Sequence, residues 1–342
     1  MRYSNLSTAA QTAYASLSSA SRLEDVRSVA SLPGSFSRKI VKGHEYWYYQ
    51  TPDLTGKQIQ IFLGAASAEL TSLIERHRQG DTTTNHLRQL TRQAIAAGCP
   101  SIVSAHAKII ERLADAGFFR AGGILVGTHV YMAYQNYLGV RWLSGAQTLD
   151  LDFAHAGRNV SVAIPSDVTM DMGSEIEALQ MGFMPIKSLT TYVKSDERDL
   201  QIDFVTCVHR GGDTPVLVRA LNAVMQPLKF MEFSMEAPIQ LTLLAQRGPI
   251  TVNAPPPEKY AVHKLLVFGE RSQQMRVKAS KDLDQAASLI AYLLINDEDL
   301  LLETWRSLLA NGPGWRQRAL EGLKALNARY PDIDTAALWD GV

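Results

Sequence analysis

The fold of this chain is decided by residues 148–153, which read Thr-Leu-Asp-Leu-Asp-Phe. Because side chains on a strand alternate between its two faces, the apolar residues of this stretch can enter a core while Asp150 and Asp152 stand side by side on the opposite face. Residues 200–205, Leu-Gln-Ile-Asp-Phe-Val, repeat the pattern around Asp203. The sequence therefore predicts two strands that carry three carboxylates.

Three carboxylates that converge on one spot need a counter-charge. At 4 Å and an effective dielectric constant of 20, each pair of like charges costs about 4 kcal/mol. A divalent cation removes this cost, and hard oxygen ligands suit Mg²⁺, which keeps several waters and shares its other positions with substrate phosphates. The same alternation also occurs in ordinary half-exposed strands and in calcium loops, so the interpretation depends on the neighbouring sequence.

The preceding segment predicts a phosphate site. Residues 124–126 form a short apolar run that ends in Gly127 and Thr128, and residues 129–138 have the apolar spacing of a helix. A glycine between a strand and a helix lets the backbone approach a ligand closely, and the N–H groups of the helix start can receive a triphosphate. We therefore expect phosphate and metal to meet at one edge of a sheet.

This order of elements resembles the nucleotidyltransferase superfamily that includes DNA polymerase beta. Residues 122–128, Gly-Gly-Ile-Leu-Val-Gly-Thr, and 257–264, Pro-Glu-Lys-Tyr-Ala-Val-His-Lys, resemble the bacterial nucleotidyltransferase-like proteins, whose relatives include toxins of type IV toxin–antitoxin systems. The resemblance is firmest over residues 118–206. The chain departs from the pattern in two ways, because Asp150 follows Thr128 by 22 positions, a long interval, and Gly-Thr replaces the commoner Gly-Ser.

The resemblance implies a metal-dependent nucleotidyltransferase. Asp150 and Asp152 would bind the metal on a nucleoside triphosphate, and Asp203 would complete a second metal position and favour deprotonation of the attacking hydroxyl. Two Mg²⁺ ions about 4 Å apart can stabilise the attacking and leaving oxygens of an in-line displacement. A nucleoside monophosphate would pass to a hydroxyl on an RNA end, a protein or a small molecule, with release of pyrophosphate.

The resemblance also assigns the triphosphate contacts. Gly127 and Thr128 would hold the triphosphate through backbone N–H and hydroxyl groups, and Lys264, on a later helix, would be aimed at it. A lysine on an amphipathic helix can instead be simply solvated. Toxin relatives often carry Arg/Lys-Asp-x-x-Asp further on, whereas here Asp284 follows Asp282 by two residues, which weakens a toxin assignment.

The predicted fold class is α+β, with a nucleotidyltransferase-fold mixed sheet and flanking helices. We expect an N-terminal helical region with a small antiparallel sheet at 1–115, a catalytic domain at 116–254 and a C-terminal helical domain at 255–342. The finer expectations outside the central sheet are strands at 35–41, 45–50 and 58–63, helices at 8–31, 65–78, 83–97 and 103–116, and two strands within 229–253.

Composition agrees with a soluble enzyme of more than one domain. The 342 residues are 46% hydrophobic, yet no run approaches the roughly 20 apolar residues that a membrane span needs. Residues 1–21 lack the pattern of a secretory signal. The two cysteines are too few for a disulfide framework or a cysteine zinc site, so we expect a cytoplasmic protein.

A basic and aromatic stretch near the N-terminus supports a different function. Arg38, Lys39 and Lys42 adjoin the aromatic residues 46–49, a mixture that can grip phosphates and stack bases, although such aromatics more often pack a core. The 34 basic and 34 acidic residues give no global attraction to nucleic acid. The alternative is therefore a non-catalytic nucleic-acid-binding or toxin–antitoxin regulatory module that retains the fold. An antitoxin or a second copy of the chain remain open as partners.

Overall fold

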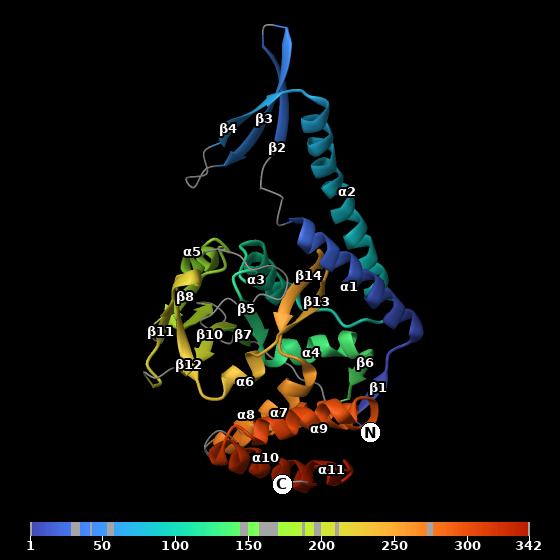
Figure 1. The fold of residues 1–342 in the computed structure, drawn as a ribbon, viewed down its shortest axis with the longest axis vertical. Helices are drawn as coiled ribbons and strands as arrows, with labels where there is room; N and C mark the ends of the chain where they lie inside the picture. Colours follow the sequence, from blue (N-terminus) through green and yellow to red (C-terminus); the bar gives the residue numbers. More distant parts are fainter. Residues whose placement is uncertain are drawn as a thin grey trace.

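The computed structural model arranges the chain in three regions (Figure 1). A small antiparallel sheet on a long helix lies at one end, a mixed sheet lies in the middle, and a group of helices lies at the other end. The structure describes residues 2–28, 35–41, 43–52, 58–143, 150–156, 170–186, 189–194, 200–208, 212–271 and 276–340. Lys42 and the first two residues of the stretch 148–153 lie outside these ranges.

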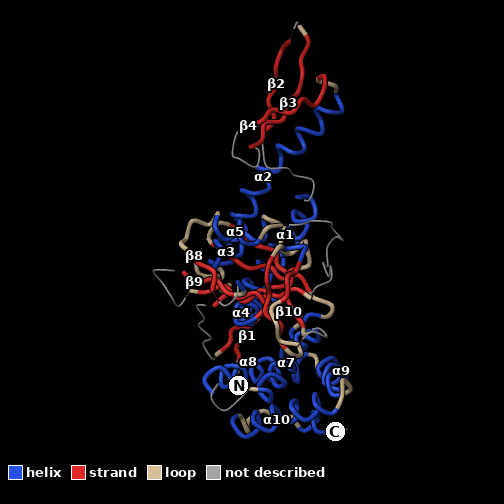
Figure 2. The backbone as a smooth tube through the Cα atoms, turned by 90° about the vertical axis from the view of Figure 1, so that its left-hand side faces the viewer, coloured by secondary structure: helices blue, strands red, loops and turns tan. Residues whose placement is uncertain are grey.

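The N-terminal region contains the expected three-stranded sheet. Its elements are β1 (Tyr3–Asn5), α1 (Thr8–Ser28), β2 (Ser35–Val41), β3 (His44–Pro52), β4 (Gln58–Ala65), α2 (Ala68–Ala96) and α3 (Ser104–Asp115). The strands β2, β3 and β4 pair antiparallel in that order. Both views place this sheet at the far end of α2, away from the middle sheet (Figures 1 and 2).

The prediction of two helices at 65–78 and 83–97 is wrong. One helix of 29 residues, α2, runs through both segments. An interior glycine costs a helix about 1 kcal/mol relative to alanine, and a helix this long tolerates Gly80. The Gly-Asp-Thr sequence at 80–82 therefore does not break the helix, although it is typical of a turn.

The middle of the molecule is a mixed sheet of seven strands. Its elements and the neighbouring segments are β5 (Gly123–Val126), α4 (Gly127–Leu138), β6 (Val140–Trp142), β7 (Asp150–His155), α5 (Met172–Glu177), β8 (Phe183–Ile186), β9 (Thr191–Lys194), β10 (Gln201–Cys207), β11 (Val216–Val218) and β12 (Ala223–Leu228). Strand β10 lies parallel to β7 on one side. On its other side it pairs with β9 along its first half and with β12 along its second half. The α+β class and the mixed sheet are as predicted.

A hairpin connects the N-terminal region to the sheet. It consists of β13 (Ile239–Ala245) and β14 (Gly248–Ala254), preceded by α6 (Met231–Met235). The two strands within 229–253 are confirmed, but the segment before residue 236 is helical. Helix α1 packs on the hairpin, where the Tyr14 hydroxyl donates to the carbonyl oxygen of Thr242 at 3.2 Å. The hairpin thus has the core on one side and α1 on the other.

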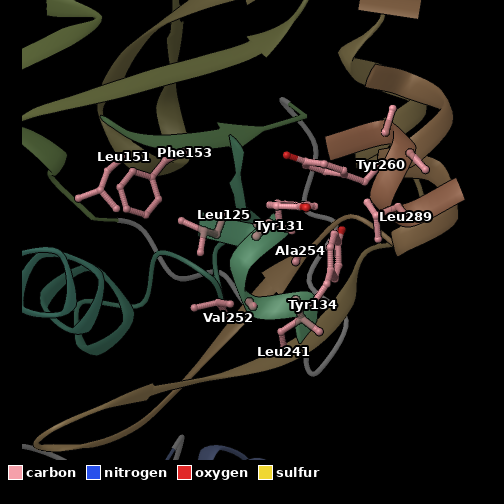
Figure 3. Packing of buried hydrophobic residues seen from close by; sticks show 14 of the residues in the cluster. Leu125, Tyr131, Tyr134, Leu151, Phe153, Leu241, Val252, Ala254, Tyr260 and Leu289 are labelled. Carbon is pink, nitrogen blue, oxygen red and sulfur yellow. The ribbon is translucent and has the colours of Figure 1, made fainter. Parts of the chain in front are cut away.

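The C-terminal helices complete the main core. They are α7 (Pro257–Glu270), α8 (Arg276–Asn296), α9 (Glu298–Leu309), α10 (Pro313–Arg329) and α11 (Ala336–Trp339). Buried side chains from β5, β7, α4, β14, α7 and α8 form one cluster (Figure 3). Leu125, Phe153 and Val252 from the strands and Leu289 from α8 are fully or almost fully buried in it. The domain limits at 115 and 254 stay predictions.

Candidate active site

The strands β7 and β10 place the three aspartates on one face of the sheet. The two strands are parallel neighbours, and their register pairs Asp203 with Asp152 and Gln201 with Asp150. Paired residues of adjacent strands point to the same face, and alternate residues of one strand do so as well. Their neighbours on the other face, Leu151 among them, are buried. The structure therefore brings the three predicted residues together, while their metal-binding role stays a prediction.

Two hydrogen bonds fix the carboxylate of Asp203. The Thr191 hydroxyl donates to Oδ1 at 2.6 Å, and the side-chain amide of Gln201 donates to Oδ2 at 3.0 Å. Thr191 comes from β9, which pairs with β10 at this position. Each carboxylate oxygen has two lone pairs, so both oxygens retain one for a further ligand. These bonds orient Asp203 without blocking it.

Gly127 makes the close turn that the sequence predicts. Its φ of +70° lies in the left-handed region that favours glycine. A Cβ added at this position would collide with Oδ2 of Asp152. The carboxylate of Asp152 therefore lies directly against the backbone of the turn, at the start of α4. Only glycine satisfies both the conformation and the space.

A buried hydrogen-bond network holds the turn in place. The side-chain amide of Gln285 donates to Oγ1 of Thr128 at 3.2 Å. The Tyr260 hydroxyl lies 2.8 Å from Oε1 of Gln285 and 3.0 Å from the carbonyl oxygen of Gly127, and its single proton serves one of these acceptors at a time. Burial raises the pKa of Tyr260 well above its usual range, so the phenol stays a donor. The helices α7 and α8 thus fix the position of the glycine turn.

Lys264 lies beside this network, where it and Arg271 form ion pairs with the buried Asp282. Its ammonium nitrogen lies 2.7 Å from Oδ1 of Asp282, and Nε of Arg271 lies 2.6 Å from Oδ2. Burial alone would lower the pKa of Lys264, but the charge of Asp282 raises it well above its usual value. Burial likewise opposes the charge on Asp282, whose pKa Lys264 and Arg271 nevertheless lower. Lys264 and Asp282 are therefore both charged near neutral pH.

A cavity of about 660 Å³ lies between the sheet and α7. The predicted residues Gly127, Asp152 and Lys264 line it, whereas Thr128, Asp150 and Asp203 lie outside its lining. The helix side is one face of α7, which presents Tyr260, His263, Lys264, Val267 and Glu270, together with Arg271 directly after the helix. The volume lies in the range of about 300–1,000 Å³ that small-molecule sites occupy.

The donor chemistry of the acidic face fits a magnesium ion that arrives with phosphates. Within the described residues, no three His, Cys, Asp or Glu side chains form a ready metal site. Nucleotide-bound Mg²⁺ takes one or two protein carboxylates and fills its other positions with water and phosphate oxygens. Asp152 and Asp203, paired across β7 and β10, can provide such carboxylates. The described residues therefore do not preassemble a site with three protein ligands.

Two buried histidines lie close to this face. Nε2 of His129, on α4, is 2.9 Å from Nδ1 of His106. Burial, with a contribution from His106, lowers the pKa of His129 to about 3. His263, on α7, lines the cavity, and burial lowers its pKa to about 3 as well. Both rings are therefore neutral at physiological pH.

The sequence pattern missed Arg271 and the network of Tyr260 and Gln285. One signal was available, because positions 260, 264 and 267 recur at the helical spacing of one face of α7, and position 271, directly after the helix, continues that spacing. That spacing could have added Arg271 to Lys264. The partners on α8 have no local signal, since Asp282 and Gln285 meet α7 only through tertiary packing.

The family of the chain follows from a comparison with known protein families. Residues 104–310, more than half of the 342 residues, match the family model described as Nucleotidyltransferase. The chain therefore belongs to this nucleotidyltransferase family and is a transferase. The matched range extends from the start of α3 to the end of α9, so it contains the acidic strands, the Gly127 turn and Lys264 of α7. The match favours the enzyme over the non-catalytic module.

The other comparisons add less. Among solved structures, the chain is similar to an antigenic nucleotidyltransferase-like protein from Paracoccidioides brasiliensis, with 14% identity over 70% of this chain and 95% of that chain and a TM-score of 0.34. A TM-score this low supports no further conclusion. No curated protein matches the chain. In the part of the chain that the structure describes, every helix is too short or too polar to cross a membrane.

Proposed function

We propose that this protein transfers a nucleoside monophosphate from a nucleoside triphosphate to a hydroxyl acceptor and releases pyrophosphate. The observation that carries the proposal is the register of β7 and β10, which sets Asp203 beside Asp152 directly next to the Gly127 turn. Phosphate binding at a helix start and carboxylates one strand away are the two requirements of this chemistry. Membership of the nucleotidyltransferase family supports the same reaction.

Each residue has a role in this proposal. Asp150, Asp152 and Asp203 hold Mg²⁺, which supplies charge neutralisation for the phosphates when it is bound. Asp203, oriented by Thr191 and Gln201, faces the acceptor hydroxyl and favours loss of its proton. Gly127 and Thr128 receive the triphosphate at the start of α4.

Lys264 neutralises the triphosphate from the opposite wall of the cavity. Its side chain is 16% exposed, and it is charged because Asp282 is its partner. A charge-assisted hydrogen bond is roughly twice as strong as a neutral one. A phosphate between Lys264 and the Gly127 turn would therefore be held on two sides, which favours the in-line geometry of transfer.

The acceptor and the cellular setting belong to the proposal as well. We infer a cytoplasmic protein, because the chain has two cysteines, Cys99 and Cys207, both of them buried and too few for a disulfide framework. The acceptor is an RNA end, a protein or a small molecule, and an antitoxin or a second copy of the chain is the partner we would seek first.

A labelling assay tests the proposed reaction. The purified protein is incubated with each α-labelled nucleoside triphosphate, Mg²⁺, and separate RNA, protein and metabolite fractions, and label transfer and pyrophosphate are measured. Transfer to one fraction is expected, and Asp152→Asn should abolish it while leaving the protein folded. Asp299→Asn, an exposed acidic residue on α9, is the matched control and should have no effect. Full activity of Asp152→Asn would refute the assigned site.

A further inference from the structure

Arg271 is a cation in the cavity lining, which also contains Lys229, and it has no role in the reaction proposed above. It follows the last turn of α7, and its side chain lines the same cavity as Lys264 and Asp152. The guanidinium group has five N–H donors in a planar fork. Its Nε donates to Oδ2 of Asp282, and among the described residues no other group takes a hydrogen bond from the remaining four donors.

Asp282 joins the two cations through a single carboxylate. Lys264 contacts Oδ1 and Arg271 contacts Oδ2, so the two positive groups are no further apart than one carboxylate and two hydrogen bonds. Asp282 is buried, with 4% of its side chain exposed, whereas Lys264 and Arg271 are 16% and 22% exposed. The negative charge is therefore on the protein side and both cations reach the cavity. The three groups carry a net charge of one positive unit.

The arrangement of these three charged groups is better explained by polyphosphate binding than by stabilisation of the fold alone. Burying three charges is costly, and apolar residues in their place are often neutral or stabilising. Arginine binds phosphate oxygens with two parallel N–H groups, and the two terminal nitrogens of Arg271 have no hydrogen-bond acceptor among the described residues. Lysine adds a point charge next to it. An adjacent guanidinium and ammonium group can therefore bind neighbouring phosphoryl groups of one polyphosphate.

We propose that Arg271 binds the triphosphate of the donor nucleotide together with Lys264, while Asp282 holds both cations in place. This inference rests on the proposed function and extends it, because it assigns to Arg271 the phosphoryl groups that leave as pyrophosphate. The guanidinium would neutralise charge that grows on the leaving group, a contribution that lysine in its place would only partly supply.

Binding of inorganic tripolyphosphate tests the inference without any assumption about the base. By isothermal titration, Arg271→Gln should weaken binding ~10-fold or more, as expected for a lost charged hydrogen bond, and Arg271→Lys should recover part of the loss. Lys259→Gln is the matched control, because Lys259 lies on the same helix but pairs with Glu236 outside the cavity lining. Its affinity should equal that of the wild type. Equal binding by Arg271→Gln and the wild type would overturn the inference.

A measurement on the unaltered protein guards against misfolding of the variants. Phenylglyoxal modifies accessible arginines, and mass spectrometry reports each site. Tripolyphosphate should protect Arg271 and leave the exposed Arg247 reactive. Equal modification of Arg271 with and without tripolyphosphate would contradict the inference. If the wild type bound neither tripolyphosphate nor any nucleoside triphosphate, the proposed function itself would fail, whereas nucleotide binding without Arg271 protection would reject Arg271 alone.

Discussion

Replacing Gly127 by alanine should damage both the fold and the proposed site. At φ +70°, a residue with a Cβ costs roughly 1–2 kcal/mol relative to glycine. The new Cβ would also lie 2.9 Å from Cγ of Asp152 and closer still to Oδ2, so the whole carboxylate must rotate. A side chain forced off its rotamer adds about 1 kcal/mol. We expect a total loss of about 2–3 kcal/mol in the free energy of unfolding.

Gly43→Ala is the matched control for the backbone contribution. Gly43 has a similar φ of +83°, but no atom lies within 4 Å of its added Cβ. Urea unfolding of both variants should therefore show a loss of about 1–2 kcal/mol for Gly43→Ala. The difference between the two variants measures the collision with Asp152.

Activity separates the two variants further. Because Asp152 must move, Gly127→Ala should lose ~100-fold or more in nucleotidyl transfer, the effect of a misplaced catalytic group. Gly43→Ala, in the distant small sheet, should retain the rate of the wild type. Full transfer activity in Gly127→Ala, with no larger stability loss than in Gly43→Ala, would refute the close approach of the turn to the carboxylate.

Three further outcomes are expected. Unfolding raises the pKa of His129 and of His263 from about 3 to 6.5, so their contribution to stability is complete above pH 6.5 and falls as the pH drops towards 3. At pH 5 each histidine should lower the free energy of unfolding in urea by about 2 kcal/mol, and His129→Gln should remove about half of this pH dependence. Equal stability at pH 7 and pH 5 would contradict this expectation. Tyr260→Phe should lower the free energy of unfolding by about 1–2 kcal/mol, because it removes the donor to a buried amide oxygen, and no change would mean that this hydrogen bond is dispensable. Thr191→Val should raise the Mg²⁺ concentration for half-maximal transfer ~10-fold or more, because Asp203 loses a partner that orients it. An unchanged Mg²⁺ titration would show that this hydrogen bond does not orient a metal ligand.

The acidic strands could be predicted because their signal is local. Alternation along β7 and β10 decides which face each side chain takes, and burial on one face then fixes the register. The turn at Gly127 was predictable for the same reason, since strand, glycine and helix follow one another directly. Sequence alone, however, could not show that Asp152 touches this turn.

Other parts were decided by contacts between distant segments. Residues before β13 were expected to be a strand, yet Phe230 has a left-handed φ of +67° and the short helix α6 follows it. Asp282 and Gln285 lie on α8, and only the packing of α8 against α7 brings them to Lys264 and Thr128. Local propensity contains no information on such pairings, so the helical wall of the site had to be seen in the structure.

The network from Gln285 and Tyr260 to the start of α4 has a consequence for the architecture. The segments before residue 255 and the helix α7 each provide one wall of the cavity, so a fragment that ends at residue 254 would lack the wall that carries Lys264 and Arg271. If a triphosphate binds in this cavity as proposed, its binding and the docking of α7 and α8 are thermodynamically linked, and the bound triphosphate should strengthen the junction between the two walls. The substrate would thus stabilise the contact between two parts of the same chain.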